Sequence, residues 1–159
     1  MRKFKKGEIE GVAIKSAVKH KDERGFLAEI YRNDEVPDSY RPVMAYLSVT
    51  NPGIARGPHE HNDQYDYFFF VGPGEFKVTL WDNRKQSPTY DNKMEIIAGE
   101  SDPKIVVVPP GVVHAYRCIS KVPGQVINAP NRLFKGEGRR EPVDEIRWET
   151  RDDNPFELD

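Results

Sequence analysis

The chain has 159 residues and a mass of 18.3 kDa, a length that fits a single domain. Its 24 basic and 26 acidic residues give a net charge of −2, so no basic surplus is available to neutralise the phosphates of a nucleic acid. The mean hydropathy of −0.72 and the short apolar stretches exclude a membrane-spanning helix. The 12 Gly and 13 Pro exceed average usage and exclude a helical bundle.

The start of the chain, MRKFKKGEIEGV, is basic but is not followed by the apolar segment of a secretion signal. The lone Cys118 cannot form an internal disulfide, which fits a reducing compartment. We therefore expect a cytoplasmic protein with neither a nucleic acid nor a membrane as partner.

Short runs rich in β-branched and aromatic residues recur along the chain, separated by Gly, Pro, Asn and Asp. In chain order, nine runs are predicted as strands: 12–18, 25–31, 43–49, 65–71, 75–81, 94–97, 105–108, 114–119 and 125–128. In the run from Glu75 to Trp81 apolar and polar residues alternate, as expected for a strand with one buried face. Nine strands at this spacing predict a barrel or a sandwich.

The C-terminal part has a different pattern. Pro142 followed by VDEIRWE predicts one short helix, with proline in its first turn. We expect one domain over residues 1–159, with a core at about 11–130 and a C-terminal segment, 131–159, that packs on this core or is solvated.

Three of the four histidines fall in two motifs. His59 and His61 are two residues apart in RGPHEHNDQYD, so in an extended segment both rings project from one face. Asp66 lies five residues further on, and His114 ends PPGVVH. An isolated histidine on a strand is usually a packed or solvated side chain, but three at ordered spacing favour a functional site.

Two kinds of chemistry fit these residues. In one, neutral imidazoles of His59, His61 and His114, with one oxygen from Asp66 or Gln64, ligate an Fe, Mn, Ni or Zn ion that keeps open positions. In the other, no metal is bound and one histidine, with an ordinary pKa near 6.5, is a general base. The residues alone leave both possibilities open.

The spacing of these motifs resembles the cupin superfamily. Its first motif is matched by Gly53 and the His-x-His pair with the following acid, and its second, Pro-x-Gly-x-x-His, by PPGVVH. The resemblance implies an all-β fold, the cupin double-stranded β-helix or jelly-roll barrel, with at most one or two short helices and the ligand in the barrel mouth.

Further stretches between residues 11 and 149 resemble one branch of that superfamily, the dTDP-4-dehydrorhamnose 3,5-epimerases. These stretches are DERGFLAE, RGPH, WDNRKQSPTY and PPGVVHAY. In DERGFLAE, the resemblance implies that Arg24 contacts a phosphate, that Phe26 lies near the base and that Glu29 makes a polar contact. It also implies a homodimer, paired through strands that cross between subunits.

The two histidine motifs take roles from the same resemblance. It implies that His59 is the catalytic base, that Arg56 holds the diphosphate or a sugar oxygen, and that His114 and Tyr116 line the pocket. A 4-keto sugar has acidic hydrogens beside its carbonyl, and a base near neutrality can remove one if a cation stabilises the enolate oxygen. The leading hypothesis is a cofactor-free epimerase or keto-isomerase of a 4-keto-6-deoxyhexose nucleotide.

The chain departs from the family at four positions. The lysine that supports the enolate aligns with Tyr67, the tyrosine that returns the proton with Asn128, and the aspartate that orients the base with Thr150. The glutamine two residues after the base is His61. We expect Tyr67 or Tyr116 to supply the acid in place of the family tyrosine.

These departures keep two alternatives open. One is a metal-dependent cupin enzyme, an isomerase or a dioxygenase, with His59, His61, Asp66 and His114 as ligands. The other is a cupin that binds a sugar or a nucleotide without catalysis.

Overall fold

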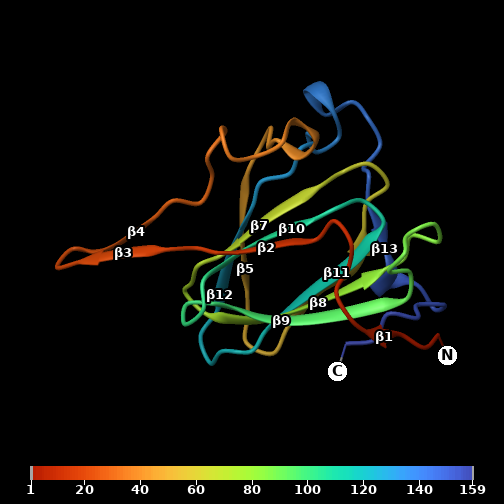
Figure 1. Ribbon diagram of the computed structural model, residues 1–159, viewed down its shortest axis with the longest axis horizontal. Coiled ribbons are helices and arrows are strands. Elements are labelled where there is room, and N and C mark those ends of the chain that lie inside the picture. The colour runs from red at the N-terminus through yellow and green to blue at the C-terminus, as the bar shows by residue number, and fades with distance from the viewer. Residues whose placement is uncertain (1, 159) are drawn as a thin grey trace.

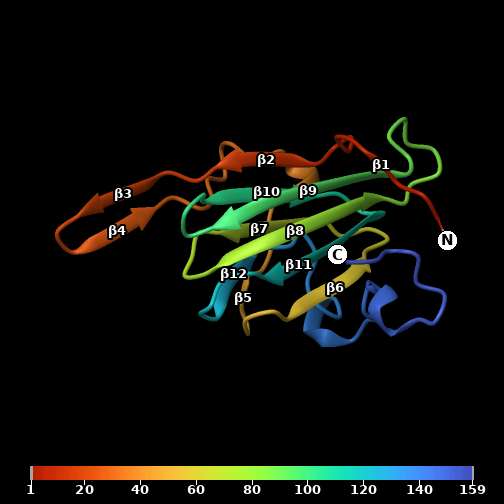
Figure 2. The ribbon, with the colours of Figure 1, turned by 90° about the horizontal axis from the view of Figure 1, so that it is seen from below.

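A computed structural model describes residues 2–158. Two sheets face each other, and a separate hairpin projects from one end (Figures 1 and 2). The six-stranded sheet has the order β1 (Lys5–Lys6), β9 (Asn92–Gly99), β8 (Glu75–Asp82), β11 (Val112–Cys118), β6 (Ala55–Glu60) and β13 (Ile146–Arg147). The five-stranded sheet has the order β2 (Ala13–Ser16), β10 (Lys104–Val108), β7 (Asp66–Phe70), β12 (Gly124–Asn128) and β5 (Tyr46–Thr50). The predicted all-β jelly roll is confirmed.

The hairpin consists of β3 (Lys19–Asp22) and β4 (Gly25–Ala28). The helical content of the described residues is three single 3-10 turns, η1 (Asp38–Tyr40), η2 (Glu137–Arg139) and η3 (Trp148–Thr150). None of these turns is long or apolar enough to cross a membrane.

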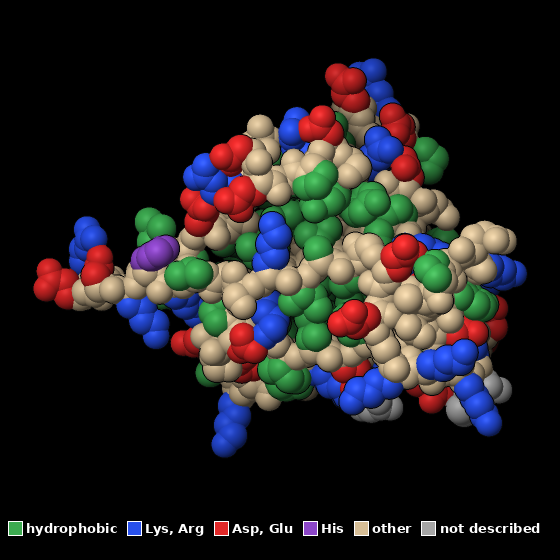
Figure 3. Space-filling view, in the orientation of Figure 1, with side chains coloured by type: hydrophobic (Ala, Val, Ile, Leu, Met, Phe, Trp, Pro, Cys, Tyr) green, Lys and Arg blue, Asp and Glu red, His purple; other side chains and the backbone are tan. Residues whose placement is uncertain are grey.

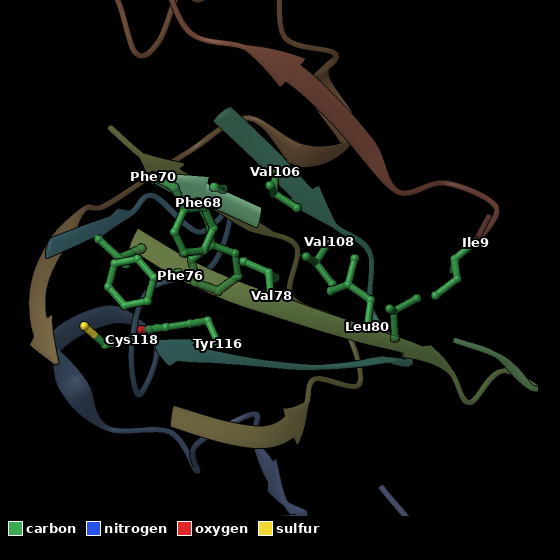
Figure 4. Packing of buried hydrophobic residues seen from close by; sticks show 13 residues of the cluster. Ile9, Phe68, Phe70, Phe76, Val78, Leu80, Val106, Val108, Tyr116 and Cys118 are labelled. Carbon is green, nitrogen blue, oxygen red and sulfur yellow. The ribbon is translucent and has the colours of Figure 1, made fainter. Parts of the chain in front are cut away.

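The main core lies between the two sheets (Figure 4). Phe76, Val78 and Leu80 of β8 point into it, which confirms the face predicted from alternation in this run. Phe68 and Phe70 of β7 pack from the opposite sheet. Each such side chain stabilises the fold by roughly 1.5–3 kcal/mol when it is fully buried.

A second cluster covers the outer face of the five-stranded sheet. Tyr67 and Phe69 of β7 point to this face and pack under Val36 and Tyr40 of the segment that follows the hairpin. Both faces of β7 are therefore buried, which explains why its sequence is a continuous aromatic run instead of an alternating one.

Each of the nine predicted strands overlaps an observed one, whereas β1, β3, β6 and β13 are not among them. Those four strands are short or polar, and β6 reads ARGPHE, without a run of β-formers. The helix predicted after Pro142 is absent from the described chain. Ile146 pairs instead with Glu60 of β6, whose carboxylate accepts a hydrogen bond from Trp148 Nε1 at 2.9 Å.

The C-terminal segment packs against the outer face of the six-stranded sheet. Phe156 is only 1% exposed and its ring contacts Trp81 and Trp148, with centroids 5.7 and 5.0 Å away. This apolar anchor, together with β13, places residues 142–149 beside the end of β6.

Candidate active site

A cavity of about 1100 Å³ opens between the sheets at the mouth of the barrel. Its walls come from β5, β6, β11 and the C-terminal segment. The side chains that matter below are Tyr46, Ser48, Arg56, His59, His61, Gln64, Phe68, Tyr116, Asp144, Glu145 and Arg147. The size exceeds the common range for drug-sized ligands and suits a larger, elongated small molecule.

An extra residue in β6 brings two predicted site residues to one face. His59 pairs with His114 and Arg56 pairs with Tyr116, so three steps on β6 match two steps on β11. Residues three apart on a regular strand point to opposite faces, but the bulge lets both side chains line the cavity. Gly57 permits it: its φ is +82°, and an added Cβ would lie 2.5 Å from the His114 carbonyl oxygen.

His61, which lines the cavity, forms a buried cluster with His114 and Asp66. Asp66 Oδ2 lies 3.1 Å from Nε2 of both rings. The other carboxylate oxygen, Oδ1, accepts hydrogen bonds from the side-chain amides of Gln64 and Asn128, at 2.9 and 2.8 Å. On the far side of each ring, Nδ1 contacts a backbone carbonyl, that of Asp144 for His61 and that of Val112 for His114. These contacts fix both rings.

The cluster contains opposite charges. Burial alone raises the pKa of Asp66, but the contacts with His114 and His61 outweigh it and hold that pKa well below its usual range. Burial likewise lowers the pKa of His61, but the hydrogen bond and the charge of Asp66 outweigh it and raise that pKa to about 9. At neutral pH the cluster therefore contains an imidazolium of His61 beside the Asp66 carboxylate.

His59 has the opposite character. Burial, followed by the neighbouring His114, lowers the pKa of His59 to about 2, so its ring is neutral at pH 7. Its Nε2 lies 4.0 Å from Oε1 of Glu145, a carboxylate whose other oxygen accepts a hydrogen bond from Arg147 at 2.6 Å. A neutral ring with an anion beside it can accept a proton and then be stabilised as an imidazolium.

Arg56 of β6 and Tyr116 of β11 link the two sheets through contacts with β5. Arg56 donates to Thr50 Oγ1 at 3.0 Å and to the carbonyl of Val49 at 2.8 Å, both on β5. The Tyr116 hydroxyl lies 3.1 Å from Ser48 Oγ on the same strand. No carboxylate pairs with Arg56 among the described residues, so its positive charge remains available to a ligand.

The histidines also fit a divalent metal ion. One ligand atom each from His59, His61 and His114 lies within 4.8 Å of the others. His114 Nε2 is buried and makes no hydrogen bond, although it lies 3.1 Å from Asp66 Oδ2. A spacing of 3.1 Å is close to that between adjacent ligands around an ion at roughly 2.1 Å from each. The backbone carbonyls at the Nδ1 atoms are the outer contacts that orient metal-binding histidines.

The structure separates one predicted group from this site. Arg24, Phe26 and Glu29 lie on or next to the projecting hairpin and do not line the cavity of their own chain. Phe26 is 52% exposed, and Arg24 pairs only with Asp22 within the hairpin. The sequence motif could not reveal this, because hairpin direction depends on contacts beyond the motif.

Tyr67, predicted as a catalytic residue, also lies elsewhere. It is next to Asp66 on β7, and adjacent residues of a strand point to opposite faces. Asp66 faces the histidines, so Tyr67 faces the outer cluster, where its ring packs on Tyr40 and Phe69. The predicted His59, His61, Asp66, His114, Tyr116 and Arg56 are brought together.

Sequence reasoning missed Glu145 and Tyr46. The acid expected near Thr150 is supplied from five residues earlier, because β13 and not a helix carries the chain past His59. Tyr46 could have been found from the alternation of β5, where Tyr46 and Ser48 share one face while Leu47 and Val49 are exposed on the other.

Comparisons with known proteins identify the family of this chain. The family model for dTDP-4-dehydrorhamnose 3,5-epimerase matches residues 6–129. The spore coat polysaccharide biosynthesis protein SpsL of Bacillus subtilis (strain 168) is 35% identical over 119 residues, which cover 75% of this chain and 78% of SpsL. The probable low-salt glycan biosynthesis epimerase Agl13 of Haloferax volcanii is 30% identical over 126 residues, 79% of this chain and 81% of Agl13.

Among solved structures, NovW, a 4-keto-6-deoxy sugar epimerase from the novobiocin gene cluster of Streptomyces spheroides, superposes with a TM-score of 0.74. It is 25% identical, and the match covers 92% of this chain and 73% of NovW. The jelly-roll fold of this chain and the match to the family model over residues 6–129 lead to the same family. The chain belongs to the dTDP-4-dehydrorhamnose 3,5-epimerase family of sugar-nucleotide isomerases.

Proposed function

We propose that this protein is an epimerase or keto-isomerase of a 4-keto-6-deoxyhexose carried on a nucleoside diphosphate, and that it works without a metal or other cofactor. The observation that carries the proposal is the position of His59, which lies at the cavity wall with Glu145 Oε1 4.0 Å from its Nε2 and Arg56 on the same face. The proposal is also supported by the family and by NovW, which is named for a sugar of this class.

The chemistry begins with a proton beside the sugar carbonyl. His59 removes it and becomes an imidazolium, which Glu145 stabilises from 4.0 Å. Negative charge then develops on the carbonyl oxygen, and the unpaired guanidinium of Arg56 is the cation on the same wall that offsets it. The cavity of about 1100 Å³ leaves room for the nucleotide beyond the sugar.

Solvent exchange tests this proposal directly. In deuterium oxide, the wild-type protein is expected to incorporate deuterium at C3 or C5 of dTDP-4-keto-6-deoxyglucose. His59→Ala should lower the exchange rate by about 10²–10⁴-fold, the usual contribution of a general base. Wild-type protein that binds this substrate without any exchange would instead establish a non-catalytic binding cupin.

We further propose that the protein is a homodimer in which the β3–β4 hairpin reaches the cavity of the partner subunit. The proposal is supported by the exposure of the residues that resemble substrate contacts: Phe26 and Leu27 are 52% and 67% exposed. A soluble hairpin seldom leaves such side chains in water without a partner. The lone, buried Cys118 fits a cytoplasmic location.

The face of the five-stranded sheet supports the same dimer. Hydrophobic side chains lie among charged ones around its edge strand β2 (Figure 3), and an apolar hollow of about 300 Å³ is lined by Tyr31, Val43, Met44 and Ile127 among others. Light scattering after size-exclusion chromatography should give twice the mass of 18.3 kDa. A mass of one chain at micromolar concentration would contradict the dimer.

A second candidate function is a metal-dependent cupin enzyme, favoured by the buried Nε2 of His114, which makes no hydrogen bond and lies 3.1 Å from Asp66 Oδ2. His61, His114, Asp66 and His59 would hold the ion, which would supply a Lewis acid when bound. Elemental analysis of the purified protein, followed by titration with Zn²⁺ or Mn²⁺, measures binding without reference to activity. His114→Ala should abolish binding, and His20→Ala, on the hairpin, should not. Full deuterium exchange by protein shown to be metal-free would exclude this candidate.

A further inference from the structure

Inversion of a carbon centre needs two groups on opposite sides of the sugar ring. One removes a proton from one face, and a second returns a proton to the other face of the enolate. His59 lies on β6 in the six-stranded sheet, so the second group must project from the facing, five-stranded sheet. The position of the family's proton-donating tyrosine holds Asn128, whose amide is not an acid at neutral pH.

Three tyrosines are candidates for the group that returns the proton, and their positions in the fold distinguish them. Tyr67 faces the outer cluster, away from the cavity. Tyr116 lies on β11, next to β6, and therefore on the same sheet as His59. Tyr46 lines the cavity from β5, in the opposite sheet.

Thr50, Ser48 and Tyr46 of β5 share the face that points toward the six-stranded sheet. Their contacts place Tyr46 near the histidines along the strand direction. Thr50 contacts Arg56, and the next inward residue, Ser48, contacts Tyr116, which is paired with Arg56. One step further along the same row is Tyr46. On the opposite sheet, the residue of β6 that is paired next after Arg56 is His59. The step from Ser48 to Tyr46 on β5 therefore follows the step from Arg56 to His59 on β6.

Asn128 holds the Tyr46 hydroxyl in a defined state. Asn128 Oδ1 accepts the backbone N–H of Tyr67 at 3.0 Å, which orients the amide. Its Nδ2 then donates one hydrogen to Asp66 Oδ1 and the other to Tyr46 Oη, each at 2.8 Å. The Tyr46 oxygen is therefore an acceptor in this pair, and within residues 2–158 no acceptor takes its own hydrogen. That hydrogen is free to point into the cavity.

The surroundings of the phenol suit a proton donor. The ring of Tyr46 is 45% exposed, but its hydroxyl end lies against the buried Asn128 and near the carboxylate of Asp66. Burial and this carboxylate raise the pKa of Tyr46, so the phenol holds its proton at neutral pH. A phenolate formed beside Asp66 is disfavoured and regains a proton from water.

We propose that Tyr46 is the catalytic acid that completes inversion, with Asn128 as its positioning residue. This inference rests on the proposed function. His59 takes the proton from the carbon, leaving the enolate; the Tyr46 O–H bond breaks as its hydrogen forms a new C–H bond on the opposite face and the carbonyl reforms. His59 then loses its proton to water and Tyr46 gains one from water, so protons balance without a co-reactant.

The experiment follows deuterium and configuration together, with dTDP-4-keto-6-deoxyglucose in deuterium oxide. Tyr46→Phe keeps the ring and removes only the hydroxyl. It should retain deuterium exchange, because the proton that His59 removes exchanges with the solvent and His59 can then deliver a deuteron to the same face. It should form the inverted sugar about 100-fold more slowly. Tyr65→Phe, a tyrosine in the outer cluster, is the matched control and should retain both reactions. Unchanged thermal midpoints check that both variants fold.

Each other outcome contradicts a different statement. Inversion by Tyr46→Phe at the wild-type rate would overturn this inference alone, as would a selective loss of inversion in Tyr116→Phe instead. Parallel loss of exchange and inversion in folded Tyr46→Phe would make Tyr46 a binding residue and overturn its role as acid. Absence of exchange in the wild type would overturn the proposed function, and this inference with it.

Discussion

The cavity wall and the β3–β4 hairpin both carry residues from motifs that resemble the family, but the two regions differ in their contacts with the rest of the chain. The wall is built within one chain: His59, His61 and His114 are held by contacts with Asp66 of β7, with Val112 of β11 and with residues 144–145 of the C-terminal segment. The hairpin makes few contacts with its own chain and leaves Phe26 and Leu27 exposed. The residues of the wall are therefore preorganised by their own chain, whereas we propose that those of the hairpin depend on another copy.

The largest effect is expected from a change in the hairpin, and it tests the proposed dependence of the hairpin on a partner subunit. Arg24→Ala combined with Phe26→Ala should lower kcat/KM by roughly 100-fold, since a charged contact and an aromatic contact are both lost. Mixing this variant, after dissociation and reassembly, with His59→Ala should restore about one quarter of the wild-type activity, because half of the dimers are mixed and each has one intact site. No recovery would show that each hairpin serves its own cavity.

A smaller effect is expected from the carboxylate behind the base. Glu145→Gln keeps the side-chain volume but removes the charge, so the imidazolium of His59 loses its stabilising partner. We expect kcat to fall by about 10-fold and the acidic limb of the pH profile to move to lower pH. Glu145→Asp, which keeps the charge, should recover part of the activity. An unshifted pH profile would assign Glu145 a structural role only.

The buried cluster of His61, His114 and Asp66 should make the free energy of unfolding depend on pH. The pKa of His61 is raised to about 9, above about 6.5 in the unfolded chain, so its contribution is complete below pH 6.5 and is lost as pH rises through 9. His61→Gln should flatten this fall, which we expect to be a few kcal/mol at most, in urea unfolding at pH 6.5 and 9. An equal fall in both proteins would argue against the ion pair with Asp66.

His59 should change the free energy of unfolding at acidic pH, where the effect of His61 is already complete. Its pKa is lowered to about 2, so the unfolded chain binds a proton more readily, and stability should fall as pH drops below 6.5. His59→Gln should reduce this loss in the same unfolding measurement at pH 5. The two histidines, two residues apart on one wall, are thereby distinguished by the sign of their pH dependence.

The smallest effect is expected at Tyr67. Tyr67→Phe removes a hydroxyl from the outer cluster and none from the cavity, so turnover should stay within about twofold and stability within about 1 kcal/mol. A large loss of turnover would show that Tyr67 reaches the substrate, and would undermine the separation of the two faces of β7.

The sequence by itself determined nine of the strands and several residues of the wall. Alternation in β8 predicted its buried face, and the two-residue spacing predicted that His59 and His61 lie on one face, whereas the resemblance to the cupin motifs brought His114 to them. Local patterns suffice for these features because strand periodicity and turn residues are properties of neighbouring positions.

Only the tertiary structure decided which distant groups complete the site. Glu145 reaches His59 because Phe156 and β13 anchor the C-terminal segment, and Tyr46 meets Asn128 through the pairing of β5 with β12. Tyr67 faces away because Asp66, its neighbour on β7, faces inward. These placements depend on sheet order, register and long-range packing, which no stretch of residues specifies alone.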